Sequence, residues 1–111
     1  MTVNERLIAA ISPLVSVCEP DNYDGTAPEY CVFRYDESPE VFSDGYPGVI
    51  LAPVILDWYL PNGVNPIKKK RQMCEAIFGA GFTYPYVTNA SDGGAQHFVF
   101  EFEVGDGEDL G

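Results

Sequence analysis

The stretch HFVFEFEV, from His97 to Val104, decides the fold of this chain. Its large apolar residues occupy every second position, which is the period of a β-strand with one buried side. The side expected to face a core consists of Phe98, Phe100, Phe102 and Val104. The opposite side consists of His97, Val99, Glu101 and Glu103. The stretch therefore predicts a sheet with one apolar face and one more polar face.

Other stretches supply neighbouring strands. The segment YCVFRYD, from Tyr30 to Asp36, is rich in aromatic and β-branched residues and predicts a strand. The segment VILAPVILDWYL, from Val49 to Leu60, predicts a longer strand that projects beyond the sheet as one arm of a long hairpin. Pro53 has no N–H for a ladder, so a bulge or an edge position is expected there. Shorter strands are expected at residues 14–18, 41–43 and 83–88.

Two helices are expected to cover the apolar face. Thr2 and Glu5 have the spacing of a capping box, and Pro13 ends the first helix. Asn65 caps the second helix with Pro66 at its first position. Glycines at positions 79 and 81 end that helix, one of them in a left-handed conformation. The apolar face of the second helix is expected to consist of Ile67, Cys74, Ile77 and Phe78, with Met73 alongside.

This order of elements predicts an α+β fold, with a single mixed or antiparallel sheet and both helices packed on one face. Residues 1–104 form one domain, and residues 105–111 (GDGEDLG) are expected to be an acidic, disordered tail. The predicted sheet core consists of Phe33, Ile55, Phe98, Phe100 and Phe102. The helical residues expected to cover it are Leu7, Ile8, Ile11, Ile77 and Phe78.

Composition excludes several classes of protein. Hydrophobic residues make up 46% of the 111 positions, so a core can form and wholesale disorder is excluded. No apolar run approaches the ~20 residues of a membrane helix, and no signal peptide is evident. Seventeen acidic and six basic residues give a formal charge of −11, which disfavours nucleic-acid binding.

Residue types with catalytic or metal-binding chemistry are few. His97 shares a strand face with Glu101 and could act as a general base, but a half-exposed strand histidine is favoured because no nucleophile is near in sequence. Asp21, Asp24 and Glu29 carry oxygen ligands for calcium, but they miss the EF-hand spacing, which favours a solvated turn. Phosphate-binding glycine motifs and a nucleophile elbow are absent from the sequence.

The three cysteines do not indicate a disulfide or a zinc site. Cys18, Cys31 and Cys74 are widely spaced and include no CxxC pair, so buried thiols in a reducing cytosol are expected. The sequence as a whole predicts neither an enzyme nor a bound cofactor or metal.

Four of the six basic residues form one run, from Lys68 to Arg71, at the start of the second helix. Lys70 and Arg71 are expected to flank the core, with Lys68 and Lys69 pointing to solvent. The run is interpreted as a solvated face, as a nucleic-acid site (disfavoured by the net charge), or as a self-complementary contact that pairs subunits head to tail.

The chain resembles the tail terminator and tail completion proteins of the head–tail junction of long-tailed bacteriophages. The resemblance covers NERLIAAISPL (Asn4–Leu14), YCVFRYD (Tyr30–Asp36) and LDWYLP (Leu56–Pro61). It continues through the basic helix after Pro66, AGFT (Ala80–Thr83) and HFVFEFEV (His97–Val104), and so spans nearly the whole chain as a pattern of elements.

The resemblance implies a hexameric ring, found in the virion and in the host cytoplasm during assembly, that terminates or completes the tail tube. The implied partners are other copies of the chain, the tail tube protein and the head connector proteins. DNA would pass through the ring without specific binding, with acidic side chains lining the channel and the basic run at a subunit contact. Residues expected at subunit or partner contacts are Lys68, Lys69, Lys70, Arg71, Tyr46, Trp58 and Tyr59. The alternative function is a small acidic protein-binding module, either a host-factor inhibitor or a DNA mimic.

Overall fold

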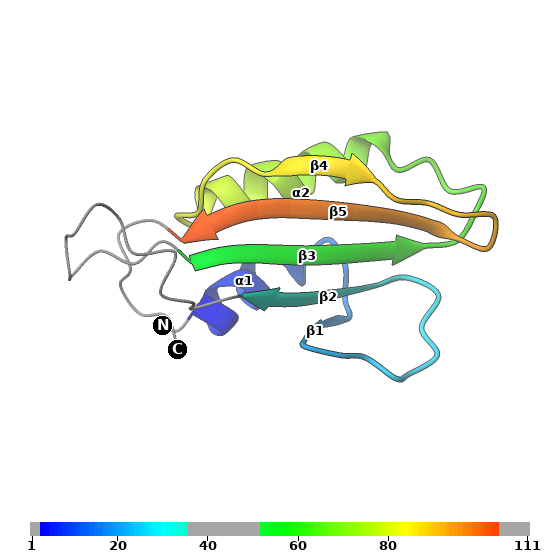
Figure 1. The fold of residues 1–111 in the computed structure, drawn as a ribbon, viewed down its shortest axis with the longest axis horizontal. Helices are drawn as coiled ribbons and strands as arrows, with labels where there is room; N and C mark the ends of the chain where they lie inside the picture. The colour runs from blue at the N-terminus through cyan, green and yellow to red at the C-terminus, as the bar shows by residue number, and fades with distance from the viewer. Residues whose placement is uncertain (1–2, 36–51, 105–111) are drawn as a thin grey trace.

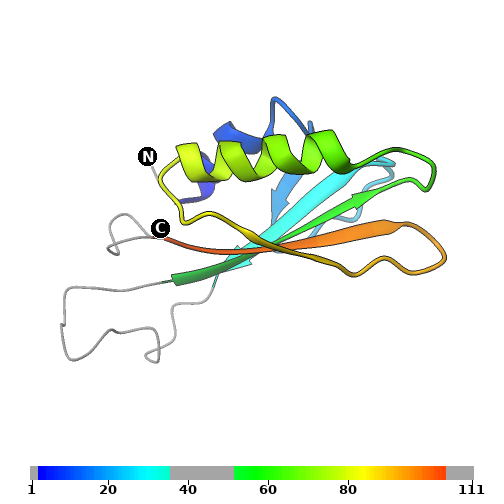
Figure 2. The ribbon, with the colours of Figure 1, turned by 90° about the horizontal axis from the view of Figure 1, so that it is seen from above.

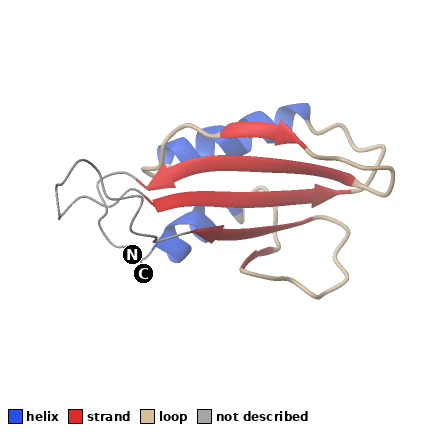
Figure 3. Cartoon of the chain, in the orientation of Figure 1, coloured by secondary structure: helices blue, strands red, loops and turns tan. Residues whose placement is uncertain are grey.

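A computed structural model describes residues 3–35 and 52–104, and it has the α+β fold that the sequence predicts. The elements follow one another as α1 (Val3–Ile11), β1 (Cys18–Pro20), β2 (Tyr30–Tyr35), β3 (Ala52–Leu60), α2 (Ile67–Gly79), β4 (Tyr86–Asn89) and β5 (Gln96–Val104). The strands form one mixed sheet in the order β1-β2-β3-β5-β4, in which only the β1–β2 pair is parallel (Figures 1 and 3).

Both helices lie on the same face of the sheet, as expected (Figure 2). Leu7 and Ile11 of α1 and Met73 and Ile77 of α2 are fully buried against the sheet. The opposite face of the sheet carries no helix in the described part of the chain. The described part of the chain is therefore two layers thick, with one core between them.

The predicted alternation of β5 is confirmed. Phe98, Phe100 and Phe102 are buried, whereas Glu101 and Glu103 are exposed. The strand pairs with β3 along its whole length, from Ala52 opposite Val104 to Leu60 opposite Gln96. This pairing places the phenylalanines of β5 opposite the apolar side of β3.

The predicted core was wrong at Ile55. That residue lies opposite Arg34 and Glu101, on the face of the sheet that carries no helix. The core side of β3 consists instead of Val54, Leu56, Trp58 and Leu60. Trp58 is fully buried, so the prediction that it forms a surface contact was also wrong. Both errors share one cause, the phase given to β3: Ile55 shares its face with Asp57 and Tyr59, whereas the face of Trp58 carries only apolar residues.

Pro53 does not produce the expected bulge. β3 lies between β2 and β5, and its register with β5 runs without interruption through Pro53 opposite Glu103. The described pairing with β2 reaches only Val54, opposite Tyr35. The proline therefore has a described strand neighbour on one side, which is compatible with its missing N–H.

The strand expected at residues 14–18 begins later than predicted. The backbone N–H groups of Leu14 and Val15 both donate to the Ile11 carbonyl, so the chain turns there, and β1 begins only at Cys18. The strand expected at residues 41–43, the first part of the strand expected from Val49 and the tail at 105–111 lie outside the described residues.

Helix α2 begins as predicted but buries a narrower stripe. Asn65 Oδ1 accepts a hydrogen bond from the Ile67 N–H (3.0 Å), and Pro66 is already helical. Ile67 and Phe78, both expected in the core, are 62% and 58% exposed. Phe78 follows the buried Ile77, and about 100° of helical rotation turns it away from the sheet. The core contains Phe82 instead, which follows the turn at Gly81.

We expect Phe100→Ala to lower the free energy of unfolding by about 3–5 kcal/mol, because it removes a fully buried ring from the centre of β5. Glu101→Ala, at the neighbouring exposed position, should change it by less than about 0.5 kcal/mol. Urea denaturation of the two variants measures both values. Equal losses would contradict the assigned phase of β5.

Gly81 and Gly79 provide a second matched pair. Gly81 has a φ of +102°, and an added Cβ would lie 3.3 Å from Arg6 Nη1, so Gly81→Ala should destabilise the fold by about 1–2 kcal/mol. Gly79 ends α2 with no atom near an added Cβ, so Gly79→Ala should be neutral or stabilising by up to about 1 kcal/mol. Thermal unfolding of both variants tests this, and a stable Gly81→Ala would contradict the left-handed turn.

Candidate functional site

The basic run on α2 is divided by the fold into side chains with different roles. Lys69 is half-buried, and its Nζ lies 3.2 Å from Glu29 Oε1. Glu29 also accepts a hydrogen bond from the buried indole N–H of Trp58 (2.9 Å). Lys69 and Trp58 together hold the loop between β1 and β2 against the sheet. The expectation that Lys69 points to solvent was therefore wrong.

Lys70 also contributes to packing. It lies three and four residues before Met73 and Cys74, on the buried stripe of α2. Its Nζ lies 5.2 Å from the centre of the Phe98 ring, within the range of a cation–π contact. The prediction that Lys70 flanks the core is confirmed.

The other two cations, Lys68 and Arg71, are exposed. Arg71 was expected beside the core, but it lies about 100° further around the helix than Lys70. Within residues 3–35 and 52–104, neither cation takes part in an ion pair. They line an open concavity of about 600 Å³ at the start of α2. We call this surface the basic groove; its residues are Asn65, Ile67, Lys68, Arg71 and Gln72.

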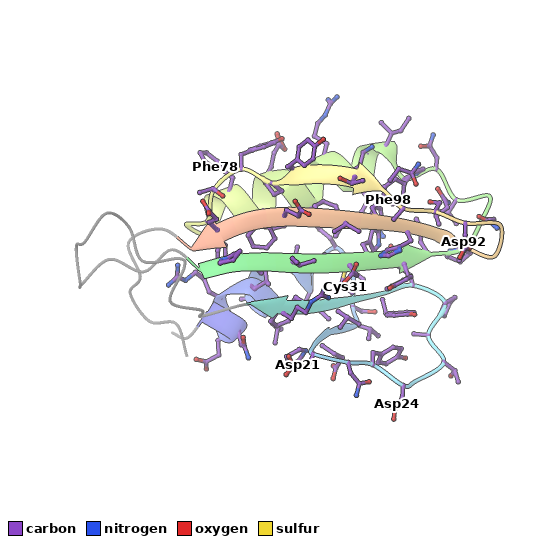
Figure 4. All side chains as sticks on the ribbon, in the orientation of Figure 1. Asp21, Asp24, Cys31, Phe78, Asp92 and Phe98 are labelled. Carbon is purple, nitrogen blue, oxygen red and sulfur yellow. The ribbon has the colours of Figure 1, made fainter. Side chains whose placement is uncertain are left out.

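A second exposed surface lies at the other end of α2. Phe78 and Tyr84 are 58% and 56% exposed, and their ring centres are 5.8 Å apart. Tyr86, on the edge strand β4, is 71% exposed but lies opposite Glu101, on the face of the sheet without helices, and so is separate from this surface. Figure 4 shows Phe78 at the end of α2 opposite to the basic groove. We call Phe78 and Tyr84 the aromatic patch. Sequence analysis missed it, because Phe78 was assigned to the core and Tyr84 shows no distinctive pattern.

The face of the sheet without helices carries a row of stacked rings. Tyr30, Tyr59 and His97 lie side by side on β2, β3 and β5, with ring centres 4.8 Å and 4.2 Å apart. Tyr23 extends the row from the loop, 4.8 Å from Tyr30. Tyr59, predicted at a contact, is half-buried, and burial together with the nearby Asp57 carboxylate raises its pKa. Because the rings contact one another through their faces, they offer a binding partner mainly their edges.

Asp57 lies beside this row and joins two strands. It accepts a hydrogen bond from Arg34 (3.2 Å), and its other oxygen lies 2.8 Å from His97 Nε2. Sequence analysis paired His97 with Glu101 along the same strand, whereas the partner comes from the neighbouring strand β3. A hydroxyl nucleophile would have to contact the His97 ring. The Ser91 hydroxyl instead bonds to the backbone carbonyl and N–H of His97. This arrangement fits a histidine that fixes the sheet.

The acidic loop does not gather its carboxylates. Glu29 points inward to Lys69 and Trp58, while Asp21 and Asp24 lie on the outer rim of the loop (Figure 4). Among the described residues, no group of three His, Cys, Asp or Glu side chains has the geometry to hold a metal ion.

The cysteines are buried thiols, as predicted. Cys18 and Cys31 lie opposite each other on the parallel strands β1 and β2 and are not bonded. Burial raises the pKa of Cys18 to about 12, and it also raises the pKa values of Cys31 and Cys74. All three thiols are therefore protonated and poorly reactive at neutral pH.

Tyr46, expected at a contact, lies outside the described residues. No helix in the described ranges has the length and apolar character needed to span a membrane.

We expect Lys69→Met to lower the free energy of unfolding by about 1 kcal/mol, because it leaves the half-buried Glu29 carboxylate without its cation. Lys68→Met removes an equal charge from the exposed side of the same helical turn and should have almost no effect. Urea denaturation at low salt compares the two. An equal loss in Lys68→Met would contradict the division of the basic run.

No protein-family model matches this chain, and a search of curated proteins finds no match. The functional argument therefore rests on the geometry of the described residues. Its main features are the basic groove and the aromatic patch, two exposed surfaces at opposite ends of α2.

Proposed function

We propose that this protein is a structural assembly protein of a tailed bacteriophage, forming a ring at the head–tail junction that terminates or completes the tail tube. The proposal starts from the resemblance described above. The observation that carries it is the pair of dissimilar exposed surfaces, the basic groove and the aromatic patch, at opposite ends of α2.

Such a pair of surfaces suits a ring. A two-fold dimer joins identical surfaces, whereas a ring needs a contact between two different surfaces of neighbouring subunits. Helix α2 has 13 residues and is about 20 Å long, so its two ends can contact different neighbours. Exposed aromatic side chains are also enriched in protein interfaces. In this proposal the partners are other copies of the chain, the tail tube protein and the head connector.

The charge distribution fits the passage of DNA through the ring. Each cation that contacts a phosphate adds salt-dependent affinity, so a basic channel would retain the genome. Lys69 and Lys70 are engaged within the subunit, which leaves the Lys68 and Arg71 pair at one end of α2. We therefore place the basic groove at a subunit contact and acidic side chains along the channel. No catalytic step or cofactor belongs to this role.

We expect the wild-type chain to form a ring-sized oligomer at micromolar concentration, and Lys68→Glu with Arg71→Glu to weaken its association. Each exposed ion pair contributes only about 0–1 kcal/mol, so the effect on one contact is modest but is repeated around the ring. High salt should weaken the wild-type oligomer in the same way. Sedimentation velocity measures the mass, and circular dichroism confirms that the variant remains folded.

Reversing Lys69 is a less informative choice, because it also breaks the ion pair with Glu29. A wild-type chain that stays monomeric at all concentrations, alone and with the tail tube protein, would contradict the ring. It would favour the small acidic binding module. Tight binding of the isolated protein to duplex DNA at physiological salt, lost on the double reversal, would favour a nucleic-acid site instead.

A further inference from the structure

We propose that the basic groove binds the acidic segment that follows β5, residues 105–111, of a second copy of this chain. This inference rests on the proposed ring and names the contact that would hold neighbouring subunits together. The segment has the sequence GDGEDLG, with Asp106, Glu108 and Asp109 as its charged residues.

The chemistry of the groove favours an acidic peptide. Lys68 and Arg71 are exposed side by side at the start of α2, and the first turn of that helix contains no acidic residue. A helix N-terminus attracts negative charge, so carboxylates arriving from outside would interact favourably with both the helix and the two cations. Ile67, which is 62% exposed in the same groove, offers an apolar contact for a leucine such as Leu110.

The geometry favours a neighbour's segment over the chain's own. Helix α2 and strand β5 run in the same direction, so Val104 lies at the end of the molecule away from the basic groove (Figures 1 and 2). Asp106, Glu108 and Asp109 are two, four and five residues beyond Val104, which gives them a reach of at most about 7, 14 and 18 Å. Lys68 lies 11 residues before the end of α2, about 17 Å along the helix, which Asp106 and Glu108 cannot span and which Asp109 spans only when the segment is fully extended.

The resulting contact has a direction. Each subunit presents a basic groove at one end and the start of an acidic segment at the other, so copies add head to tail. A contact of this kind closes into a ring when the rotation between subunits allows it. The two parts are also separate in sequence, so each can be altered without changing the other.

Two full-length variants with opposite changes test this contact. The first carries Lys68→Glu and Arg71→Glu, and the second carries Asp106→Lys and Glu108→Lys. In each variant the groove and the segment have the same sign of charge, so each alone should associate at least about tenfold more weakly than wild type. Mixed in equal amounts, every groove meets an opposite segment on the other variant. The mixture should regain the wild-type mass in sedimentation velocity.

A matched control reverses two acidic residues elsewhere. Glu19→Lys with Asp24→Lys makes the same change in net charge at exposed positions of β1 and the loop, and it should associate at least as well as wild type. A segment variant that assembles normally would overturn this contact while leaving the ring intact. A mixture that stays monomeric when both variants have lost assembly would overturn it as well. A wild-type chain that never forms a ring would overturn both this contact and the proposed function.

Discussion

The pairing of β3 with β5 is the constraint on which the rest of the structure depends. Nine consecutive residue pairs, from Ala52 and Val104 to Leu60 and Gln96, lock two central strands in one register. A shift by one residue would turn every side chain of β3 to the other face. The register therefore decides that Trp58 enters the core and that Asp57 reaches His97 on the opposite face.

The same register determines how the basic run is used. With Trp58 in the core, its indole N–H meets Glu29, and Glu29 in turn holds Lys69. Phe98, opposite Trp58 on β5, provides the ring that lies under Lys70. Two of the four cations are thus committed to the fold by contacts that originate in the sheet. Only the remaining pair is available for a partner.

The parts of the fold that the sequence predicted correctly are those with a clear period or a local signal. β5 alternates strictly, Pro13 follows the end of α1, and Asn65 caps α2. β3 was predicted as a strand, but its phase was misassigned, because the single charged residue Asp57, on the same face as Ile55, was not weighed against the wholly apolar face of Trp58. Phe78 was misplaced for a different reason, since it adjoins Ile77 and the angular width of the buried stripe depends on how α2 sits on the sheet.

The candidate surfaces, too, were predicted only where they follow a local sequence pattern. The basic run is visible as four consecutive letters, but its separation into Lys69 and Lys70 on one side and Lys68 and Arg71 on the other arises from tertiary contacts. Glu29 and Phe98 lie about 40 and 30 residues away from these lysines in sequence. The aromatic patch likewise joins α2 to the segment leading into β4, and its parts are individually unremarkable in the sequence.

The single tryptophan occupies a position with a spectroscopic consequence. Its indole is excluded from water, stands 5.5 Å from the Phe98 ring, and is hydrogen-bonded to the carboxylate that binds Lys69. The emission wavelength and lifetime of this one fluorophore therefore respond to any displacement of α2 or of the loop carrying Glu29. The protein contains an intrinsic optical reporter beside the helix that we assign to assembly, which makes changes at that helix observable without an attached label.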